Sequence, residues 1–401
     1  MTKLPQKMPK FEFPQLVIGG LMTKLHELAA LGQAIWLDYI RRAFITSGEM
    51  QALIDLGVRG MTSNPTIFEK AILSGQGSKP DQLGEYDSDL ERLSKAGKTP
   101  LAVYEALAIE DIQAAADLLR SVYDDTEGGD GYVSLEVNPT LASQTMETIE
   151  EAHRFWLQVD RPNLMIKIPA TVEGLPAITA SIASGINVNV TLIFSLSRYH
   201  QVVDAYLKGL EQRLAAGKSI NHVASVASFF VSRVDSKVDK HLDSILLENG
   251  PHAELAASLK GKAAVANAKL AYSLFQELFG SQRFIALQSQ GARVQRPLWA
   301  STSTKNPAYS DILYVQELIG PHAVNTVPQN TLEAYLDHGE VRQTISEDND
   351  EARLVLEKLE NLGISMEQVT KELEDEGVEA FAKSFTSLLE SIESRQNKLR
   401  R

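Results

Sequence analysis

The sequence predicts an α/β protein built on a closed (β/α)8 TIM barrel, with an insertion after the second strand and a helical extension at the C-terminal end. Eight short apolar or alternating runs recur along the chain and are separated by segments of helical periodicity. Such alternation predicts a parallel sheet, because parallel neighbours need helical crossovers. The 401 residues, 44% of them hydrophobic, suffice for a barrel of about 250 residues with additions.

Each expected element follows from its own run of residues. The expected strands are Ala34–Ile40, Val58–Asn64, Tyr132–Val137, Leu164–Ile168, Gly185–Phe194, His222–Phe230, Pro297–Ser301 and Ala323–Val327. The expected helices are Glu49–Leu56, Leu101–Val122, Leu141–Val159, Leu175–Ala183, Leu196–Ala216, Lys262–Phe279 and Ala308–Ile319. Arg283–Leu287 is interpreted as the tail of the preceding helix. Eight such units favour a closed barrel over an open doubly wound sheet.

Segments beyond this repeat set the expected domain limits. Residues 70–100 are rich in Gly, Ser, Asp and Lys and are expected to form an irregular insertion. We expect a helical lead-in at residues 1–30, the catalytic barrel at 31–340 and a helical extension at 341–401 packed on the barrel.

The extension carries helix-end signals. Ser365 and Gln368 have capping-box spacing, and Gly363 and Gly377 stand where glycines would end helices. Its apolar stripe is interpreted as a face docked on the core, and consists of Val378, Phe381, Phe385, Leu388, Leu389 and Ile392.

Composition narrows the possible partners. Lys and Arg number 39 and Asp and Glu number 52, which gives a net charge of −13. This balance argues against nucleic acid and anionic membranes, so an anionic substrate needs a few local cations. The chain has no cysteine and no metal-ligand histidine spacing, so no metal is expected. It has no signal-peptide core and no apolar run of membrane-spanning length, so we expect a cytoplasmic protein.

The most informative residue is Lys167, within the apolar run Leu164–Pro169. An ammonium in a buried strand costs free energy, because desolvation disfavours the charged form of a lysine. The neutral amine is a nucleophile toward carbonyl carbon. The alternative is a lysine that reaches out of the strand end to pair with a surface acid.

Other strands place polar residues on one face. Residues two apart share a face, so Asn187, Asn189 and Thr191 lie together, as do Ser134 and Glu136. By the same count Trp36 and Asp38 share a face, Thr62 pairs with Asn64, and Ser228 pairs with Phe230, with Arg233 just beyond. The seventh strand continues toward Ser303 and Lys305. In a parallel barrel these polar groups point inward and converge at the carboxyl ends of the strands.

A shared pocket of Lys167, Asp38 and Glu136 suits one chemistry. A lysine imine makes or breaks a carbon–carbon bond with acid–base help, so two carboxylates and a lysine suffice for class I aldol chemistry without metal or cofactor. An ion-pair cluster that fills the barrel is the competing interpretation.

The same segments resemble transaldolases of the longer bacterial subfamily, without the isomerase fused to some members. The similar motifs run from residue 30 to about 340 and include Ile35-Trp36-Leu37-Asp38, Thr62-Ser63-Asn64-Pro65, Ile166-Lys167-Ile168-Pro169 and Arg296-Pro297-Leu298-Trp299. The resemblance implies that Lys167 forms an imine with a ketose. It implies that Glu136 is the acid–base group, through a water positioned by Thr191, and that Asp38 takes the proton of the C4 hydroxyl.

The resemblance also implies a set of substrate-binding residues: Asn64, Asn189, Ser228, Phe230, Arg233 and Lys305. Arg233 would bind the substrate phosphate, and Lys305 stands where relatives commonly carry a second arginine. A lysine supplies the charge with less bidentate geometry.

The implied reaction moves a dihydroxyacetone unit from sedoheptulose 7-phosphate to glyceraldehyde 3-phosphate, so the partners are sugar phosphates. The first alternative is a fructose 6-phosphate aldolase that releases free dihydroxyacetone, but such relatives carry Gln and Tyr where this chain has Glu136 and Phe230. The second is a sugar-phosphate-binding barrel without catalysis, which would have no need to keep the lysine and both carboxylates. The sequence leaves a homodimer open.

Overall fold

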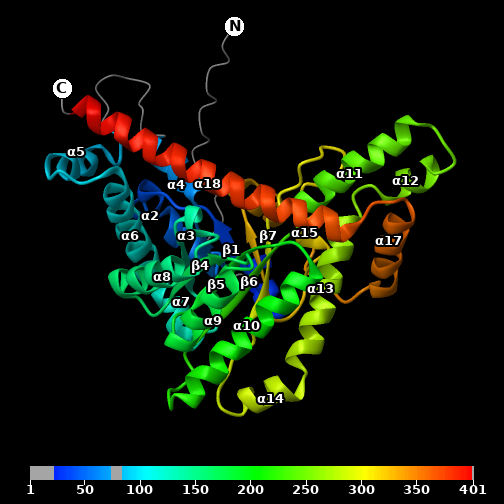
Figure 1. The fold of residues 1–401 in the computed structure, drawn as a ribbon, viewed down its shortest axis with the longest axis horizontal. Coiled ribbons are helices and arrows are strands. Elements are labelled where there is room, and N and C mark those ends of the chain that lie inside the picture. The colour runs from blue at the N-terminus through cyan, green and yellow to red at the C-terminus, as the bar shows by residue number, and fades with distance from the viewer. Residues whose placement is uncertain (1–21, 74–83, 400–401) are drawn as a thin grey trace, which may run out of the picture.

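Eight parallel strands close into a barrel in chain order. The strands lie in the centre of the molecule (Figure 1). The computed structural model describes residues 22–73 and 84–399. The strands are β1 (Gln33–Asp38), β2 (Gly60–Thr62), β3 (Tyr132–Glu136), β4 (Leu164–Pro169), β5 (Val188–Ile193), β6 (Ser225–Phe230), β7 (Arg296–Ala300) and β8 (Ala323–Val327). The predicted (β/α)8 barrel is confirmed, with every strand overlapping its expected run.

Helices surround the barrel and connect its strands (Figure 1). In the first half they are α1 (Lys24–Ala30), α2 (Arg42–Thr46), α3 (Glu49–Asp55), α4 (Pro65–Leu73), α5 (Asp87–Lys95), α6 (Pro100–Leu118), α7 (Arg120–Asp125), the 3-10 helix η1 (Pro139–Leu141), α8 (Thr145–Val159) and α9 (Gly174–Ser184). In the second half they are α10 (Leu196–Ala215), α11 (Ser232–Leu247), α12 (Ala253–Leu259), α13 (Ala263–Phe279), α14 (Gln282–Gln288), α15 (Leu313–Gln316), α16 (Gln329–His338), α17 (Asn349–Asn361) and α18 (Met366–Leu399). None of these helices is long and apolar enough to cross a membrane.

Local sequence fixes several of these boundaries. The Thr99 hydroxyl accepts a hydrogen bond from the Ala102 N–H, and Pro100 follows in the first helical position of α6. Ser195 caps α10 in the same way, through the Arg198 N–H. Gly185, with φ of 88°, ends α9 in the left-handed region that an L side chain rarely adopts. These residues fix where α6 and α10 begin and where α9 ends.

Three expected elements are wrong in their details. The helix expected at Ala308–Ile319 is only the short α15, because the residues before it are held as a connection by a bond within it, from Thr304 to the Ser310 carbonyl, and by the bond from Tyr309 to Asp239 of α11. Arg283–Leu287 is not the tail of α13, since Ser281 caps α14 as a separate helix. The insertion is not wholly irregular, because α5 forms within it; residues 74–83 lie outside the described residues.

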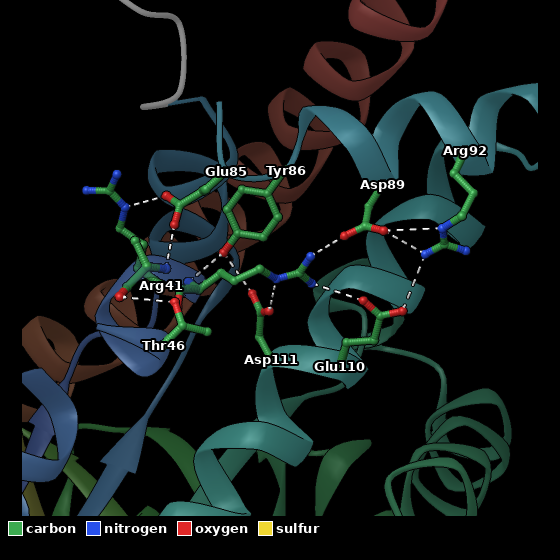
Figure 2. A network of polar contacts seen from close by, with 10 residues as sticks. Arg41, Thr46, Glu85, Tyr86, Asp89, Arg92, Glu110 and Asp111 are labelled. Carbon is green, nitrogen blue, oxygen red and sulfur yellow. Dashed lines mark hydrogen bonds and ion pairs between the residues drawn. The ribbon is translucent and has the colours of Figure 1, made fainter. Parts of the chain in front are cut away.

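A buried polar network ties α5 to the segment after β1 (Figure 2). The Arg42 guanidinium contacts Asp111 of α6, with Nε and Oδ1 separated by 2.8 Å, and also pairs with Asp89 of α5. The Tyr86 hydroxyl donates to the other Asp111 oxygen over 2.7 Å. Asp111 is 2% exposed, and burial raises its pKa against the attraction of Arg42. The insertion is therefore fastened to the strand that carries Asp38.

The extension after the barrel consists of α17 and the 34-residue α18. Gly363, with φ of 79°, follows the end of α17 as predicted, and Ser365 accepts a hydrogen bond from the Gln368 N–H. Gly377 does not end a helix, because α18 runs through it without a break. A Cβ at Gly377 would lie 2.9 Å from a methyl carbon of Leu192, so glycine here permits close approach to the barrel.

Helix α18 crosses the width of the molecule over one end of the barrel (Figure 1). The Ser387 hydroxyl donates to Glu69 of α4 over 2.6 Å, and an Arg395 nitrogen donates to the Ile72 carbonyl over 2.6 Å. Phe385, Leu388 and Ile392 of the predicted stripe are buried. The limits proposed for the lead-in, barrel and extension remain a prediction, and residues 1–21 lie outside the described residues.

Candidate active site

A cavity of about 690 Å³ opens at the carboxyl ends of the strands, beneath α18. Of the predicted site residues, all but Glu136 and Asn189 line it: Asp38, Asn64, Lys167, Thr191, Ser228, Phe230, Arg233 and Lys305. Glu136 and Asn189 lie next to Lys167 in the barrel register, on β3 and β5. The structure therefore brings the predicted residues together from the strands β1 to β7 or from the segments that follow them.

Lys167 is the centre of this arrangement and is only 5% exposed. Its Nζ lies 3.3 Å from Glu136 Oε2 and donates to the Ser63 carbonyl over 3.2 Å. The first contact comes from the neighbouring strand β3 and the second from the residue after β2, and Lys167 lines the cavity. A lysine so placed is held for attack on a carbonyl carbon that enters from above.

Glu136 and Thr191 both keep buried side-chain oxygens free of hydrogen bonds. Glu136 Oε2 and the Thr191 hydroxyl have no hydrogen-bond partner within the described residues, although Glu136 forms the ion pair with Lys167. Burial raises the pKa of Glu136, the positive charge of Lys167 opposes that rise, and the negative charge of Asp38 adds to it. A carboxyl with a raised pKa exchanges protons more readily near neutral pH.

Asp38 lies at the end of β1 and accepts a hydrogen bond from Thr62 over 2.8 Å. The Thr62 hydroxyl is also 2.7 Å from that of Thr326, which orients it. Burial raises the pKa of Asp38, while Lys167, the Thr62 hydrogen bond and more distant cations oppose the rise. Two carboxyls thus lie in the site with one lysine: Glu136, which is buried, and Asp38, which is partly buried.

A chain of polar side chains crosses the barrel floor beside Lys167. Asn189 donates through Nδ2 to the Ser134 hydroxyl over 2.9 Å and accepts from the Ser228 hydroxyl over 2.7 Å. Its amide orientation is thereby fixed. Asn64 differs, because its Oδ1 accepts the Ile67 N–H and caps the start of α4. The two predicted asparagines therefore have different local roles.

The cavity mouth is cationic. The Arg233 guanidinium lies 5.2 Å from the Phe230 ring centre and 6.0 Å from that of Phe381, and no ion pair holds it within residues 22–73 and 84–399. Burial lowers its pKa. Lys305 faces the same mouth, and burial lowers its pKa, as do the charges of Arg233 and Lys70. In a chain with a net charge of −13, these cations form a local positive patch.

Sequence reasoning missed three features of this site. Phe381 was interpreted as part of a core-packing stripe, yet its ring lines the cavity 5.7 Å from Lys167 Nζ. Lys70 of α4 also lines the cavity. Strand β5 departs from alternation, since Leu192 has φ of 62° and the pairing with β6 shifts register there. Leu192 thus meets Gly377 of α18.

A second cavity of about 420 Å³ lies at the opposite, amino-terminal end of the barrel and contains none of the predicted site residues. Its lining includes Trp36, Arg296 and Asp130, which are already bonded to one another: the Trp36 indole N–H donates to Asp130 over 2.7 Å, and Arg296 pairs with the same carboxylate at 3.1 Å. In barrels of this class that end serves stability. Among the described residues, no group of three His, Asp or Glu side chains is placed to hold a metal ion.

Comparisons with known proteins agree with this arrangement. The model of the family "Transaldolase/Fructose-6-phosphate aldolase" matches residues 35–392. A protein of Thermobifida fusca named transaldolase is 51% identical over 370 residues, which cover 92% of this chain and 97% of the relative. A transaldolase of Trichodesmium erythraeum is 47% identical over 381 residues, 94% of this chain and 98% of the relative. With matches of this length and identity, the chain belongs to the transaldolase/fructose-6-phosphate aldolase family.

Proposed function

We propose that this chain is a transaldolase that moves a dihydroxyacetone unit from a ketose phosphate to an aldose phosphate through an imine on Lys167. The observation that carries the proposal is the buried Lys167, 3.3 Å from Glu136 and in one cavity with Asp38 and with the cations Arg233 and Lys305. The names of the relatives support the transferase, and the family name covers both transferases and aldolases.

The first step joins donor and enzyme. The neutral Lys167 amine attacks the C2 carbonyl of sedoheptulose 7-phosphate, and loss of one water from the carbinolamine leaves an iminium. Glu136 supplies and removes protons for this step through a water that also binds Thr191. The Glu136 Oε2 and the Thr191 hydroxyl, which accept no hydrogen bond within the described residues, support this assignment, because each has hydrogen-bonding capacity left for such a water.

The second step breaks the C3–C4 bond. Asp38 takes the proton of the C4 hydroxyl, the bond electrons flow into the iminium, and erythrose 4-phosphate leaves with an enamine still on Lys167. The raised pKa of Asp38 supports its role as a base that returns its proton later in the cycle. Asn64 and Asn189 bind the hydroxyl groups of the three-carbon unit, with Ser228 holding the Asn189 amide.

The remaining steps run in reverse with glyceraldehyde 3-phosphate. The enamine carbon attacks the aldehyde, Asp38 returns the proton to the new hydroxyl, and hydrolysis of the iminium releases fructose 6-phosphate. Arg233 and Lys305 bind the phosphate of each aldose in turn, while Phe230 packs against the Arg233 guanidinium. The cytoplasmic location, the lack of a nucleic-acid partner and the homodimer stay open predictions.

A coupled assay with both phosphosugars tests the proposal. Sedoheptulose 7-phosphate and glyceraldehyde 3-phosphate together should yield fructose 6-phosphate and erythrose 4-phosphate, and the donor alone should yield little product. Abundant free dihydroxyacetone without an acceptor would instead identify an aldolase of the same family. Binding of both sugars without turnover would leave only a sugar-phosphate-binding barrel.

A further inference from the structure

The connection between β7 and α15, residues 301–312, carries Lys305 and is fastened to α11 at both of its ends. At the first end, Ser301 has φ of 55°, and its hydroxyl lies 3.0 Å from that of Ser232. The Ser232 N–H also donates to the Ser301 carbonyl over 3.1 Å. This end is therefore fixed beside Arg233, which follows Ser232 in the first turn of α11.

At the other end, Tyr309 holds the connection through a carboxylate of α11. Its hydroxyl donates to Asp239 Oδ2 over 2.7 Å, and the Gly261 N–H donates to Asp239 Oδ1 over 3.0 Å. Gly261 has φ of 72°, and a Cβ there would lie 2.7 Å from the Tyr309 ring. Asp239 thus joins three segments, and the glycine leaves room for the tyrosine ring against the loop before α13.

Asp235, one turn earlier on α11, makes a second junction of the same kind. Its Oδ1 accepts the Ala264 N–H over 2.8 Å, and its Oδ2 accepts the Tyr314 hydroxyl over 2.8 Å. Asp235 is 2% exposed. A buried carboxylate whose oxygens both accept hydrogen bonds is fixed in orientation, so α11, α13 and α15 meet in a rigid frame around the connection.

Lys305 depends on this frame because nothing else in the described chain holds it. Its ammonium makes no hydrogen bond and no ion pair within residues 22–73 and 84–399, and it faces the cavity mouth with Arg233. A lysine head on a flexible four-carbon stem is placed mainly by its backbone. Tyr309 lies four residues further along the chain, where the connection is fastened to Asp239.

We propose that Tyr309, through its hydrogen bond to Asp239, is a positioning residue that sets the distance between Lys305 and Arg233 and so determines affinity for the substrate phosphate. This inference rests on the proposed function. It adds that phosphate recognition depends on residues that never touch the substrate, and that the two cations act as one preformed pair.

The variant Tyr309→Phe removes the hydroxyl and keeps the ring. We expect KM for fructose 6-phosphate, with erythrose 4-phosphate as acceptor, to rise about five- to tenfold, since a hydrogen bond to a charged group is lost. The kcat should change less than twofold. With fructose and D-glyceraldehyde, neither of which carries phosphate, kcat/KM should stay at the wild-type value. The matched control is Tyr206→Phe, a buried tyrosine whose hydroxyl donates to the Arg293 carbonyl over 2.8 Å at the opposite end of the barrel.

A double-mutant cycle separates positioning from mere stabilisation. If Tyr309 acts through Lys305, the double variant Tyr309→Phe/Lys305→Ala should have the KM of Lys305→Ala alone. Asp239→Asn should resemble Tyr309→Phe in the same assay, and Tyr206→Phe should resemble the wild type. Multiplied KM effects in the double variant, or equal losses for phosphorylated and unphosphorylated substrates, would overturn the inference.

The outcomes also separate this inference from the proposed function. If the wild-type protein fails to convert the two phosphosugars, the proposed function is wrong. If the wild type is fully active and Lys305→Ala leaves KM unchanged, the reaction is correct and only the role of Lys305 and Tyr309 is refuted. If Tyr309→Phe has the wild-type KM and Lys305→Ala has a raised KM, only the positioning role of Tyr309 is refuted.

Discussion

Replacement of Arg233 by alanine should impair recognition of phosphate and leave the fold intact. Arg233 faces the cavity mouth, and within the described residues it has two aromatic neighbours and no ion pair. Among residues 22–73 and 84–399, the acid whose charge raises the pKa of Arg233 is Glu376, which is itself 2.6 Å from Lys237. The Arg233 guanidinium is therefore available to a substrate anion, because acidic side chains of the protein neutralise its positive charge only weakly.

The expected effect of Arg233→Ala is large on substrate binding and small on stability. A charge-assisted contact to phosphate contributes about 1.5–3 kcal/mol, which equals about a ten- to hundredfold loss in kcat/KM. Loss of the two contacts with aromatic rings costs about 0.5–1 kcal/mol each, but removal of a buried charge and of its repulsion from Lys305 offsets that cost. The free energy of unfolding should therefore stay within about 1 kcal/mol of the wild-type value.

The assay compares two substrate pairs in one variant. Turnover of fructose 6-phosphate with erythrose 4-phosphate should fall as stated, and turnover of fructose with D-glyceraldehyde should hardly change. Arg233→Lys should recover part of the loss, and Arg353→Ala, which removes an exposed guanidinium of α17, is the control. If Arg233→Ala lowers both activities alike, or lowers stability by several kcal/mol, Arg233 is a structural residue and the phosphate assignment is wrong.

Four further predictions concern the rest of the site and its support. Reduction with borohydride in the presence of fructose 6-phosphate should attach a three-carbon unit to the peptide that contains Lys167, with or without a chelator, and peptide mass spectrometry should detect it. Label on another lysine would contradict the mechanism. Phe230→Tyr should increase acceptor-independent release of dihydroxyacetone, because its hydroxyl lies beside the iminium and helps water attack it; an unchanged ratio of release to transfer would refute this. Burial raises the pKa of Asp38 in the folded state, so protonation of Asp38 stabilises the fold at low pH and this stabilisation is lost as pH rises through the folded pKa. Asp38→Asn should therefore be more stable than the wild type near pH 8, with the difference vanishing toward about pH 4 in denaturant titrations; a constant difference would contradict the raised pKa. Arg42→Met should cost at least about 3 kcal/mol in the same titrations, because it leaves Asp111 buried without its cation; a neutral result would mean that the network in Figure 2 contributes no net stability.

The strands and most of the inward-facing polar residues could be predicted because a period of two is a local signal. The positions of Lys167 and Glu136 follow from counting along β4 and β3, and the register then places them side by side. The count fails at Leu192, where a left-handed φ of 62° interrupts β5. No side-chain pattern in the sequence marks that position, where Leu192 lies against Gly377 of α18.

The residues that sequence reasoning missed are fixed by distant contacts. Phe381 belongs to an apolar stripe that looks like any core-facing stripe, and only the path of α18 over the barrel places its ring near Lys167. The helix expected from Ala308 fails for a similar reason, because Tyr309 finds its partner on α11, 70 residues earlier in the chain. Periodicity describes neighbours along the chain and has no information on partners so far apart.

The position of α18 over the barrel bears on the order in which the chain folds. Its bonds to α4 join residues more than 300 positions apart, such as Arg395 with Ile72 and Ser387 with Glu69. Synthesis supplies the eight strands first, and contacts of such large sequence separation form late, because the loop they close must be ordered beforehand. A nascent chain in which the eight strands have paired but α18 has not docked therefore lacks the Phe381 ring near Lys167. We therefore expect the Phe381 ring to cover the Lys167 amine only after α18 has docked on the barrel.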